Sequence, residues 1–409
     1  MLFLLYINDI TDNLSNRARL FADDTSVMYC GNDFNTMQNE INRDLVKLNE
    51  WSKIWLVDFN AKKTKSLLIS NTLVRPNINI MFNNEQVEVV ENHKHLGITF
   101  SQDGQWTTHV DNISKIALKQ INVLRKLKFI LSKQALANIY LTFIRPHLEY
   151  ACEVWDGCFN REIDKLEKIQ LEAARIVTGL TKFASREALY FETGWEVLAE
   201  RRKNRRLVMF YKMHKKLCPS YLYNCLPPLV SDTNQYNLRN NDNYTTPRTR
   251  LRLSTNSFIP QTVSDWNGLG PTIRNLPTIS TFKNTIKEIQ FKSPRYYYEG
   301  NRKICVLHAR LRHQCSQLNA DLFRINVVDN PQCRCNAPFE DVIHYLLECP
   351  LYLNERVQMF ENIQETDQNF EILLFGNDDY TDEMNLFIFD KVRNFIKHSK
   401  RFEIGRAHV

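Results

Sequence analysis

Leu20-Phe21-Ala22-Asp23-Asp24-Thr25-Ser26-Val27-Met28-Tyr29 is the stretch that decides the fold of the first part of the chain. Two short apolar runs lie on either side of an acidic pair, which predicts two short buried strands joined by a turn. The hairpin carries the carboxylates of Asp23 and Asp24 at its tip. Two adjacent carboxylates can bind divalent metal ions. Because neighbouring residues on a strand point to opposite faces, we expect the two to bind unequally, with Asp23 as the main metal ligand. A solvated acidic turn is the alternative for an isolated pair.

The segments after this hairpin carry both helix and strand signals. After a possible cap at Asp33 or Asn35, apolar residues recur at helical spacing, namely Met37, Ile41, Leu45, Leu48 and Trp55. Short strands are expected over residues 66–70, 78–82, 87–90 and 96–100. This mixture predicts an α+β fold for the first part of the chain.

Beyond Gly104 the apolar period becomes that of helices. One expected helix has an apolar face formed by Val110, Ile113, Ala117, Ile121, Leu124 and Leu127. Further helices are expected over about 133–143, 161–177 and 196–216, and an Asn-rich flexible linker or long loop over 229–247. We therefore divide the chain into the segments 1–104, 105–228, 229–300 and 301–402, and we expect residues 403–409 to be a non-native tail.

Composition narrows the class of protein. The chain has 409 residues, of which 43% are hydrophobic and 24% charged, so it can bury several cores. A formal net charge of +7 favours a polyanionic partner without demanding one. No apolar run approaches the roughly 18 residues that cross a bilayer, so we expect no membrane span. Ten scattered cysteines are typical of a reducing compartment, which predicts an intracellular location.

Four potential metal ligands are close together near the end of the chain. Cys333, Cys335, His344 and Cys349 form the pattern C-x-C-x8-H-x4-C, with His344 presented by an expected short helix. Three thiolates and one imidazole complete a tetrahedral Zn²⁺ shell. The first gap of one residue is shorter than is usual in zinc knuckles. Three ordinary cysteines and a core histidine are the alternative.

Basic residues are concentrated on two of the expected helices. The first set is Lys115, Lys119, Arg125 and Lys126, and the second is Arg201, Arg202, Arg205 and Arg206. Neutralising phosphates with such side chains releases counterions, so both sets predict nucleic-acid binding. The run Arg295-Tyr296-Tyr297-Tyr298 adds charge and possible stacking surfaces. Solvated helix faces, and tyrosines buried in a core, are the alternatives.

Several ordered motifs resemble those of one family. Phe21-Ala22-Asp23-Asp24, preceded by Leu2-Phe3-Leu4-Leu5-Tyr6-Ile7-Asn8-Asp9-Ile10, resembles the palm hairpin of reverse transcriptases from jockey-like non-LTR retrotransposons. Further matches are Asn60-Ala61-Lys62-Lys63-Thr64, His95-Leu96-Gly97-Ile98-Thr99-Phe100, Ile144-Arg145-Pro146-His147-Leu148-Glu149-Tyr150 and Lys165-Leu166-Glu167-Lys168-Ile169-Gln170. The resemblance implies the C-terminal half of a palm over 1–104, a helical thumb and extension over 105–228, and a C-terminal Cys-His knuckle.

The resemblance also implies an activity, RNA-directed DNA synthesis by two Mg²⁺ ions. Asp23 and Asp24 would bind Mg²⁺, and Lys63 would act on the leaving pyrophosphate, unless it is a solvated lysine. Leu96 and Gly97 would grip the primer, although a plain strand-ending glycine is the alternative for Gly97. The implied partners are an RNA template, a DNA primer or target, and the element RNA in a ribonucleoprotein of the nucleus and cytoplasm, with no membrane.

The chain departs from the family pattern before Leu2. The fingers and the palm strand that carries the first metal-binding aspartate have no counterpart, and Asp9 is expected to be a structural cap rather than a replacement. We therefore expect this chain to be inactive as a polymerase by itself. The alternative function is a non-catalytic remnant that binds nucleic acid through its basic helices and zinc knuckle.

Overall fold

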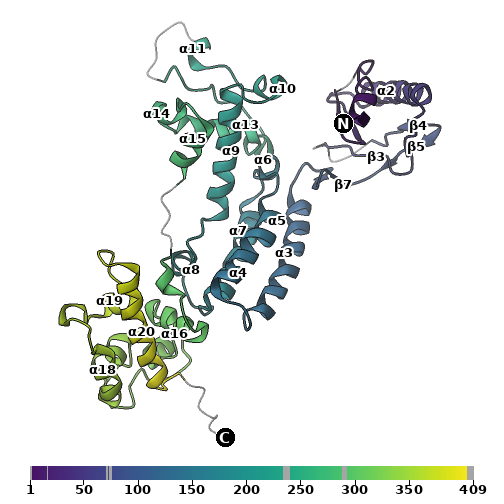
Figure 1. The fold of residues 1–409 in the computed structure, drawn as a ribbon. Coiled ribbons are helices and arrows are strands. Elements are labelled where there is room, and N and C mark those ends of the chain that lie inside the picture. The colour runs from purple at the N-terminus through teal and green to yellow at the C-terminus, as the bar shows by residue number, and fades with distance from the viewer. Residues whose placement is uncertain are drawn as a thin grey trace. The chain divides into compact units, whose positions relative to one another are not determined.

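The computed structural model describes residues 2–15, 17–70, 72, 76–233, 240–287 and 293–402. The chain divides into two compact units, Met1–His109 and Val110–Val409, and each is described here by itself (Figure 1). This division lies close to the change of apolar period after Gly104. The expected tail, residues 403–409, lies outside the described residues.

The first unit combines two helices with short strands, which confirms the α+β expectation. Its elements are α1 (Leu2–Tyr6), β1 (Arg17–Phe21), β2 (Asp24–Met28), α2 (Phe34–Trp55), β3 (Lys65–Ser66), β4 (Met81–Phe82), β5 (Glu85–Gln86), β6 (Glu88–Val89), β7 (Asn92–His95) and β8 (Ile98–Ser101). The pairs β1–β2, β4–β5 and β7–β8 are antiparallel, and β3–β6 is parallel. In the described residues each of these sheets has two strands.

Helix α2 organises the core of the first unit. Asp33 caps it, because its carboxylate accepts the backbone N–H of Thr36 at 2.8 Å. Met37 and Leu48 on its inner face pack with Phe82 and other apolar residues of the following segments. The expected helix and one of its two candidate caps are thereby confirmed. The strands are shorter than predicted: β3, β4 and β6 have two residues each and β8 has four.

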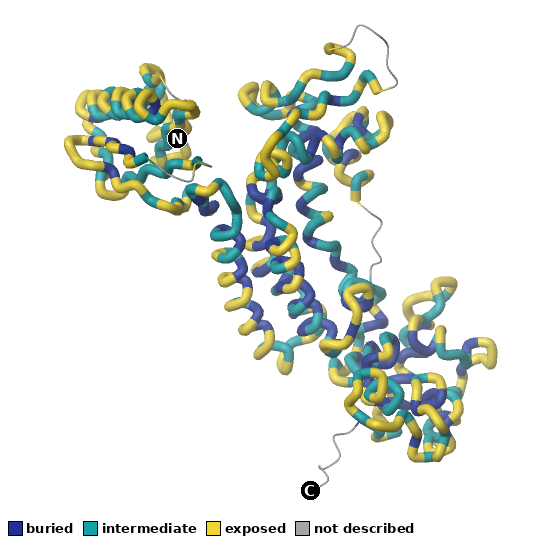
Figure 2. Tube along the Cα trace, turned by 180° about the vertical axis from the view of Figure 1, so that it is seen from behind, coloured by how far each residue is buried: buried dark blue, intermediate teal, exposed yellow. Residues whose placement is uncertain are grey.

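The second unit is helical in its described part. Its elements are α3 (Thr107–Leu127, which begins in the first unit), α4 (Lys133–Ile139), the π-helix η1 (Tyr140–Ile144), α5 (Arg145–Glu149), α6 (Cys152–Trp155), α7 (Asn160–Thr178), α8 (Arg186–Thr193), α9 (Leu198–His214), α10 (Ser220–Tyr223), α11 (Val230–Thr233), α12 (Arg252–Thr255), α13 (Phe258–Asn267), α14 (Pro271–Arg274), α15 (Ile279–Ile286), η2 (Arg295–Tyr297), α16 (Arg302–Arg312), α17 (Asn319–Arg324), η3 (His344–Glu348), η4 (Pro350–Tyr352), α18 (Leu353–Phe360), η5 (Glu365–Asp367), α19 (Phe370–Phe375) and α20 (Asp382–His398). Dark blue stripes in Figure 2 follow the inward faces of the long helices.

Two of the apolar cores in the described part of the second unit involve α9 and α20. In one, Phe210 of α9 packs with Trp266 of α13 and Phe282 of α15. Tyr244, from the Asn-rich stretch 229–247, joins this core, and its hydroxyl lies 2.8 Å from Nδ1 of His214. The described part of that stretch combines helix α11 with a loop that Tyr244 anchors in the core, while residues 234–239 lie outside the described residues. The other core brings α16, η3, α19 and α20 together.

The tyrosines of the Arg295 run belong to the interior. Tyr296 and Tyr297 are buried, and both rings contact the ring of Phe389 in α20. The structure thus favours the core interpretation of these two tyrosines over a stacking surface for bases.

Candidate metal centres and nucleic-acid contacts

The acidic hairpin forms a tight two-residue turn. Phe21 pairs with Asp24, so Ala22 and Asp23 make the turn itself. Ala22 takes a left-handed conformation with φ of 53°, which costs an alanine about 1 kcal/mol. Asp23 therefore lies on the turn and Asp24 at the start of β2, and both are exposed.

The two strands of the hairpin are less buried than the sequence predicts. Leu20 and Val27 are half-buried against the core of the first unit, but Phe21 and Met28 are 64% and 50% exposed. Each strand has a single partner in the described residues, and the core covers one face of the pair. The prediction of two buried strands is corrected to a half-exposed hairpin for this reason.

The carboxylates of Asp23 and Asp24 do not meet a third ligand in the part of the chain that the structure describes. Among the described residues, one group of three or more potential metal ligands is found, and it is the C-terminal Cys-His cluster rather than the hairpin. Asp9 accepts a hydrogen bond from Nε1 of Trp51 at 3.0 Å, which ties α2 to the turn after α1. A structural role therefore accounts for Asp9.

Lys63, Leu96 and Gly97 all lie on exposed turns. The backbone N–H of Lys63 donates to the carbonyl oxygen of Asn60 at 3.0 Å. Leu96 and Gly97 form the two-residue turn of the β7–β8 hairpin, with φ values of 47° and 84°. Positive φ at both positions defines the turn type that follows the twist of a hairpin, and glycine adopts it without strain. This conformation accounts for Gly97 by backbone geometry alone.

The basic residues predicted on the first helix lie on the solvent face of α3. Lys115, Lys119, Arg125 and Lys126 are all exposed. Arg125 donates to Glu172 of α7 at 2.9 Å, whereas the sole acidic residue of α3, Asp111, pairs with Lys165 at 2.6 Å. The lysines of α3 thus present positive charge to solvent.

Two of the basic residues predicted on the second helix, α9, are buried in the interior of the second unit. Arg202 and Arg206 are 0% and 3% exposed, and their Nε atoms donate to Asp156 at 2.6 and 2.7 Å. A guanidinium buried against a carboxylate cannot reach a phosphate, so these two residues are corrected from a binding surface to a buried ion-pair network.

Arg201 and Arg205, one turn apart on the same helix, are also paired. Arg201 pairs with Glu149 and Glu196, and Arg205 donates to the carbonyl oxygen of Glu149 at 2.8 Å. Arg205 is partly exposed, with 44% of its side chain open to solvent.

The C-terminal cluster brings together all four residues predicted as ligands. Sγ of Cys333 lies 3.7 Å from Sγ of Cys349, and Sγ of Cys335 lies 3.2 Å from Nε2 of His344. All four ligand atoms lie within 4.8 Å of one another. Tetrahedral Zn–S bonds of about 2.3 Å place two sulfurs about 3.8 Å apart, so the cluster has the dimensions of a tetrahedral metal site.

Local structure explains how Cys333 and Cys335, separated by a single residue, can both belong to one site. A turn joins Cys333 to Asn336, whose N–H donates to the carbonyl oxygen of Cys333 at 2.9 Å and whose φ is 71°. The π-helix η3 then presents His344, and the N–H of Cys349 donates to the carbonyl oxygen of His344 at 2.7 Å. Such π-turns are frequent at functional sites.

Further contacts orient the ligands. Nδ1 of His344 lies 3.5 Å from a carboxylate oxygen of Glu348, which suits a histidine whose Nε2 binds a metal. The guanidinium of Arg356 donates to the carbonyl oxygens of Leu346 and Cys349 at 2.8 and 2.7 Å, and so fixes the end of η3.

The thiols of the cluster differ in acidity. Burial raises the pKa of Cys349 to about 12 and also raises the pKa of Cys333. A backbone hydrogen bond at Ala337 lowers the pKa of Cys335 to about 7. Because metals bind thiolates, metal binding at this cluster would release protons.

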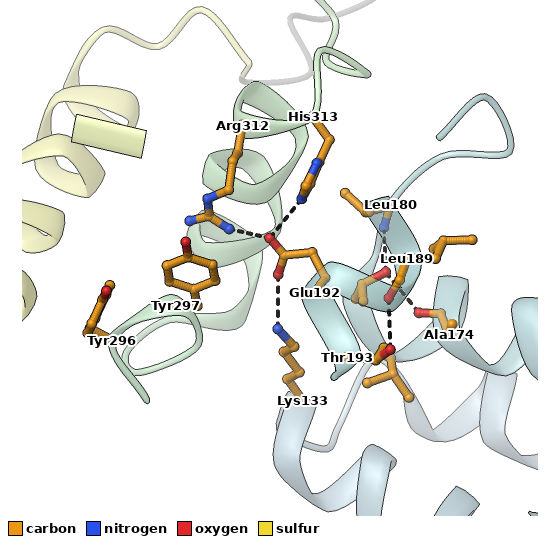
Figure 3. Close-up of polar contacts among 12 residues, drawn as sticks. Lys133, Ala174, Leu180, Leu189, Glu192, Thr193, Tyr296, Tyr297, Arg312 and His313 are labelled. Carbon is orange, nitrogen blue, oxygen red and sulfur yellow. Dashed lines mark hydrogen bonds and ion pairs between the residues drawn. The ribbon is translucent and has the colours of Figure 1, made fainter. Parts of the chain in front are cut away.

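A buried charge network that the sequence analysis missed lies elsewhere in the second unit. Figure 3 shows the carboxylate of Glu192, on α8, facing Lys133, Arg312 and His313. Glu192 is 1% exposed; Nζ of Lys133 lies 3.0 Å from one of its oxygens, and Nε2 of His313 lies 3.1 Å from the other, which also binds Arg312. The Arg312 guanidinium lies 3.7 Å from the ring centre of Tyr297.

This network keeps Glu192 ionised. Burial alone would raise the pKa of Glu192, but Arg312 and Lys133 hold it well below its usual range. Burial lowers the pKa of Lys133, and Glu192 opposes that effect. No local spacing in the sequence links residues on α4, α8 and α16, so pattern analysis had no signal for this network.

The chain therefore combines an acidic hairpin, a helical body and a cluster of cysteines and histidine that could hold a metal ion. It is similar to curated polymerases of mobile elements. It is 26% identical over 203 residues to the probable RNA-directed DNA polymerase from transposon X-element of Drosophila melanogaster, a match that covers 46% of this chain and 22% of the relative. It is 24% identical over 165 residues to the RNA-directed DNA polymerase from mobile element jockey of the same species, covering 39% and 18%.

A third relative matches most of the chain. The retrovirus-related Pol polyprotein from type-1 retrotransposable element R1 of Bradysia coprophila is 22% identical over 346 residues, which are 81% of this chain and 31% of the relative. The resemblance to non-LTR retrotransposon polymerases predicted from the sequence is confirmed at this low identity. The matches span less than a third of the length of each of these relatives.

Two further comparisons bear on class. No protein-family model matches the chain. Among the described residues, no helix combines the length and the apolar character that a bilayer crossing requires.

Proposed function

We propose that the chain is part of an RNA-directed DNA polymerase of a non-LTR retrotransposon, which uses an RNA template and a DNA primer or target. The first unit would be the C-terminal half of a palm, and the helices from α3 to α9 a thumb and its extension. The observation that carries this proposal is the acidic hairpin, found in a chain that is similar to three curated proteins of such elements.

Within this proposal the hairpin carboxylates hold Mg²⁺. Asp23, at the turn, is the main ligand and Asp24 the weaker one. Two-metal nucleotidyl transfer needs carboxylates that hold two divalent metal ions roughly 3.5 to 4 Å apart. Lys63 would stabilise the leaving pyrophosphate, and the turn of Leu96 and Gly97 would contact the primer end. The Cys-His cluster would hold Zn²⁺.

The 409-residue chain is expected to show no Mg²⁺-dependent DNA synthesis by itself, because the described hairpin supplies two carboxylates and no third ligand. A primer-extension assay on an RNA template measures this directly. If incorporation occurs and Asp23→Asn abolishes it while Asp12→Asn does not, the expectation is wrong and the hairpin is already a complete site.

Nucleic-acid binding is expected to depend on the lysines of α3. Each phosphate contact contributes about 0.9 to the slope of log affinity against log salt on duplex DNA, so Lys115→Ala, Lys119→Ala and Lys126→Ala together should reduce the slope by about 2 to 3. Fluorescence anisotropy of a labelled duplex, measured over a salt series, checks this.

The matched control for that measurement is a triple alanine variant of three exposed lysines elsewhere, namely Lys283, Lys303 and Lys397. Equal slopes for the wild type and the α3 variant would show that α3 does not contact phosphates.

A second candidate function is a binding module without catalysis, which uses α3 and the Cys-His cluster. The incomplete ligand set around the hairpin favours it. An assay of a longer polypeptide of the element, which includes the hairpin, distinguishes the two candidate functions. Mg²⁺-dependent DNA synthesis that Asp23→Asn abolishes would support the polymerase. Nucleic-acid binding without synthesis would support the binding module.

A further inference from the structure

The turn between α3 and α4 exposes two large apolar side chains side by side in the sequence. Phe129 is 82% exposed and Ile130 is 80% exposed. Single exposed apolar residues are common on protein surfaces, but two adjacent ones at the tip of a turn are costly to leave in water and point to a ligand. Neither residue was among the sequence-predicted sites.

The turn is held rigidly by the rest of the second unit. Nε of Arg302, at the start of α16, donates to the carbonyl oxygen of Lys128 at 3.2 Å. The same guanidinium donates to the carbonyl oxygens of Val177 and Ile176 at 3.0 and 2.8 Å, at the end of α7. One side chain thus fastens the ends of α3 and α7, and the backbone that carries Phe129 is fixed before any ligand arrives.

Positive charge lies next to Phe129 and along the helix that precedes the turn. Nζ of Lys128 lies 5.0 Å from the ring centre of Phe129. Lys126, Lys119 and Lys115 precede the turn and lie on one side of α3, since their spacings are close to whole helical turns. They extend about 16 Å along the helix, at a rise of 1.5 Å per residue. The sole acidic residue of α3 is paired with Lys165.

We propose that the Phe129-Ile130 tip is a wedge that enters between base pairs of double-stranded nucleic acid, while the lysines of α3 follow its phosphates. This inference rests on the proposed nucleic-acid function and names duplex as the form bound there. Apolar side chains that enter a base step partly unstack it, and flanking cations offset the cost by binding the bent backbone. The charge of α3 favours a polyanionic duplex over a second copy of this basic chain.

The test uses the full 409-residue chain and a duplex that contains a fluorescent base analogue quenched by stacking. Binding of the wild type should raise the emission about twofold or more, because the step is unstacked. The double variant Phe129→Ser with Ile130→Ser should still bind, measured by anisotropy, but should lose this rise. Val357→Ser, which removes an apolar side chain 64% exposed on α18, is the control and should behave as the wild type.

Three results would overturn the inference, and they are distinguishable. If the wild type binds the duplex and the double variant gives the same emission, nucleic-acid binding stands and the wedge does not exist. If the wild type binds no duplex, the proposed function fails along with the wedge. If the double variant loses binding to vesicles of equal parts phosphatidylserine and phosphatidylcholine, with its duplex signal unchanged, the tip binds a membrane surface instead.

Discussion

Substitution of Glu192 by glutamine is expected to lower the free energy of unfolding of the second unit by about 3 to 5 kcal/mol, the usual cost of removing one partner from a buried ion pair. The amide keeps the size of the side chain and removes its charge. Arg312, which is 4% exposed, and the nearly buried Lys133 would then face each other without a counter-ion. Urea unfolding, followed by hydrogen exchange in peptides of α8 and α16, measures the loss where it occurs.

Glu200→Gln is the matched control for this variant, because Glu200 also lies in the second unit. Glu200 pairs with Lys203 at 3.7 Å, but the two side chains are 49% and 42% exposed, so the expected loss is at most about 1 kcal/mol. Equal effects of the two substitutions would mean that the Glu192 network contributes no more than a surface pair.

The same network predicts a pH dependence. Because the pKa of Glu192 is lowered in the folded chain, its contribution is complete above the ordinary carboxyl pKa of about 4.3 and is lost as the pH falls toward the folded value. The wild type should therefore lose stability more steeply than Glu192→Gln as the medium is acidified below that range. Parallel acid profiles of the two proteins would contradict the assignment of the charge to Glu192.

The sequence predicted the helices best, because burial on one face leaves a local periodic record. The apolar residues from Val110 to Leu127 place α3 nearly to its ends. Strands left a weaker record. β7 was missed because its residues, Asn92–His95, are polar and none is buried.

Charge was the property that sequence patterns described least well. Arg202 and Lys119 look equivalent in the sequence, since each belongs to a set of basic residues on one helix. In the structure Arg202 is buried against Asp156, which lies 46 residues away in the chain, and Lys119 is exposed. Such a pairing depends on how helices pack, and helical periodicity carries no information about which distant carboxylate a given arginine meets.

The Cys-His cluster was predictable because chemistry restricts it more than packing does. Three thiols and an imidazole at short spacing have few other uses, and the turn at Asn336 resolves the short first gap. The acidic hairpin was located correctly but not its surroundings. Phe21 and Met28 are apolar, so the sequence predicts that they are buried. In the structure they are 64% and 50% exposed, and their sequence carries no sign of this difference.

The proposed Zn²⁺ at the Cys-His cluster gives the second prediction with a large expected effect. The purified chain should hold about one Zn²⁺, and Cys349→Ser should abolish stoichiometric binding, because three ligands leave the tetrahedral shell open. Cys225→Ser, which changes an exposed cysteine outside the cluster, should bind as the wild type does. Metal analysis after gel filtration measures the stoichiometry. A wild type without metal, or a Cys349→Ser variant that retains it fully, would contradict the assignment.

Loss of the metal should also loosen the C-terminal core, and the geometry says where. Tyr345 and Leu346 lie on η3 between two ligands, His344 and Cys349, and both are fully buried in that core. A structural Zn²⁺ stabilises small finger peptides by roughly 10 kcal/mol or more, but here α16, α19 and α20 share the same core and retain part of the packing. A chelator should therefore expose residues 333–349 to protease and hydrogen exchange first, with α20 following only partly.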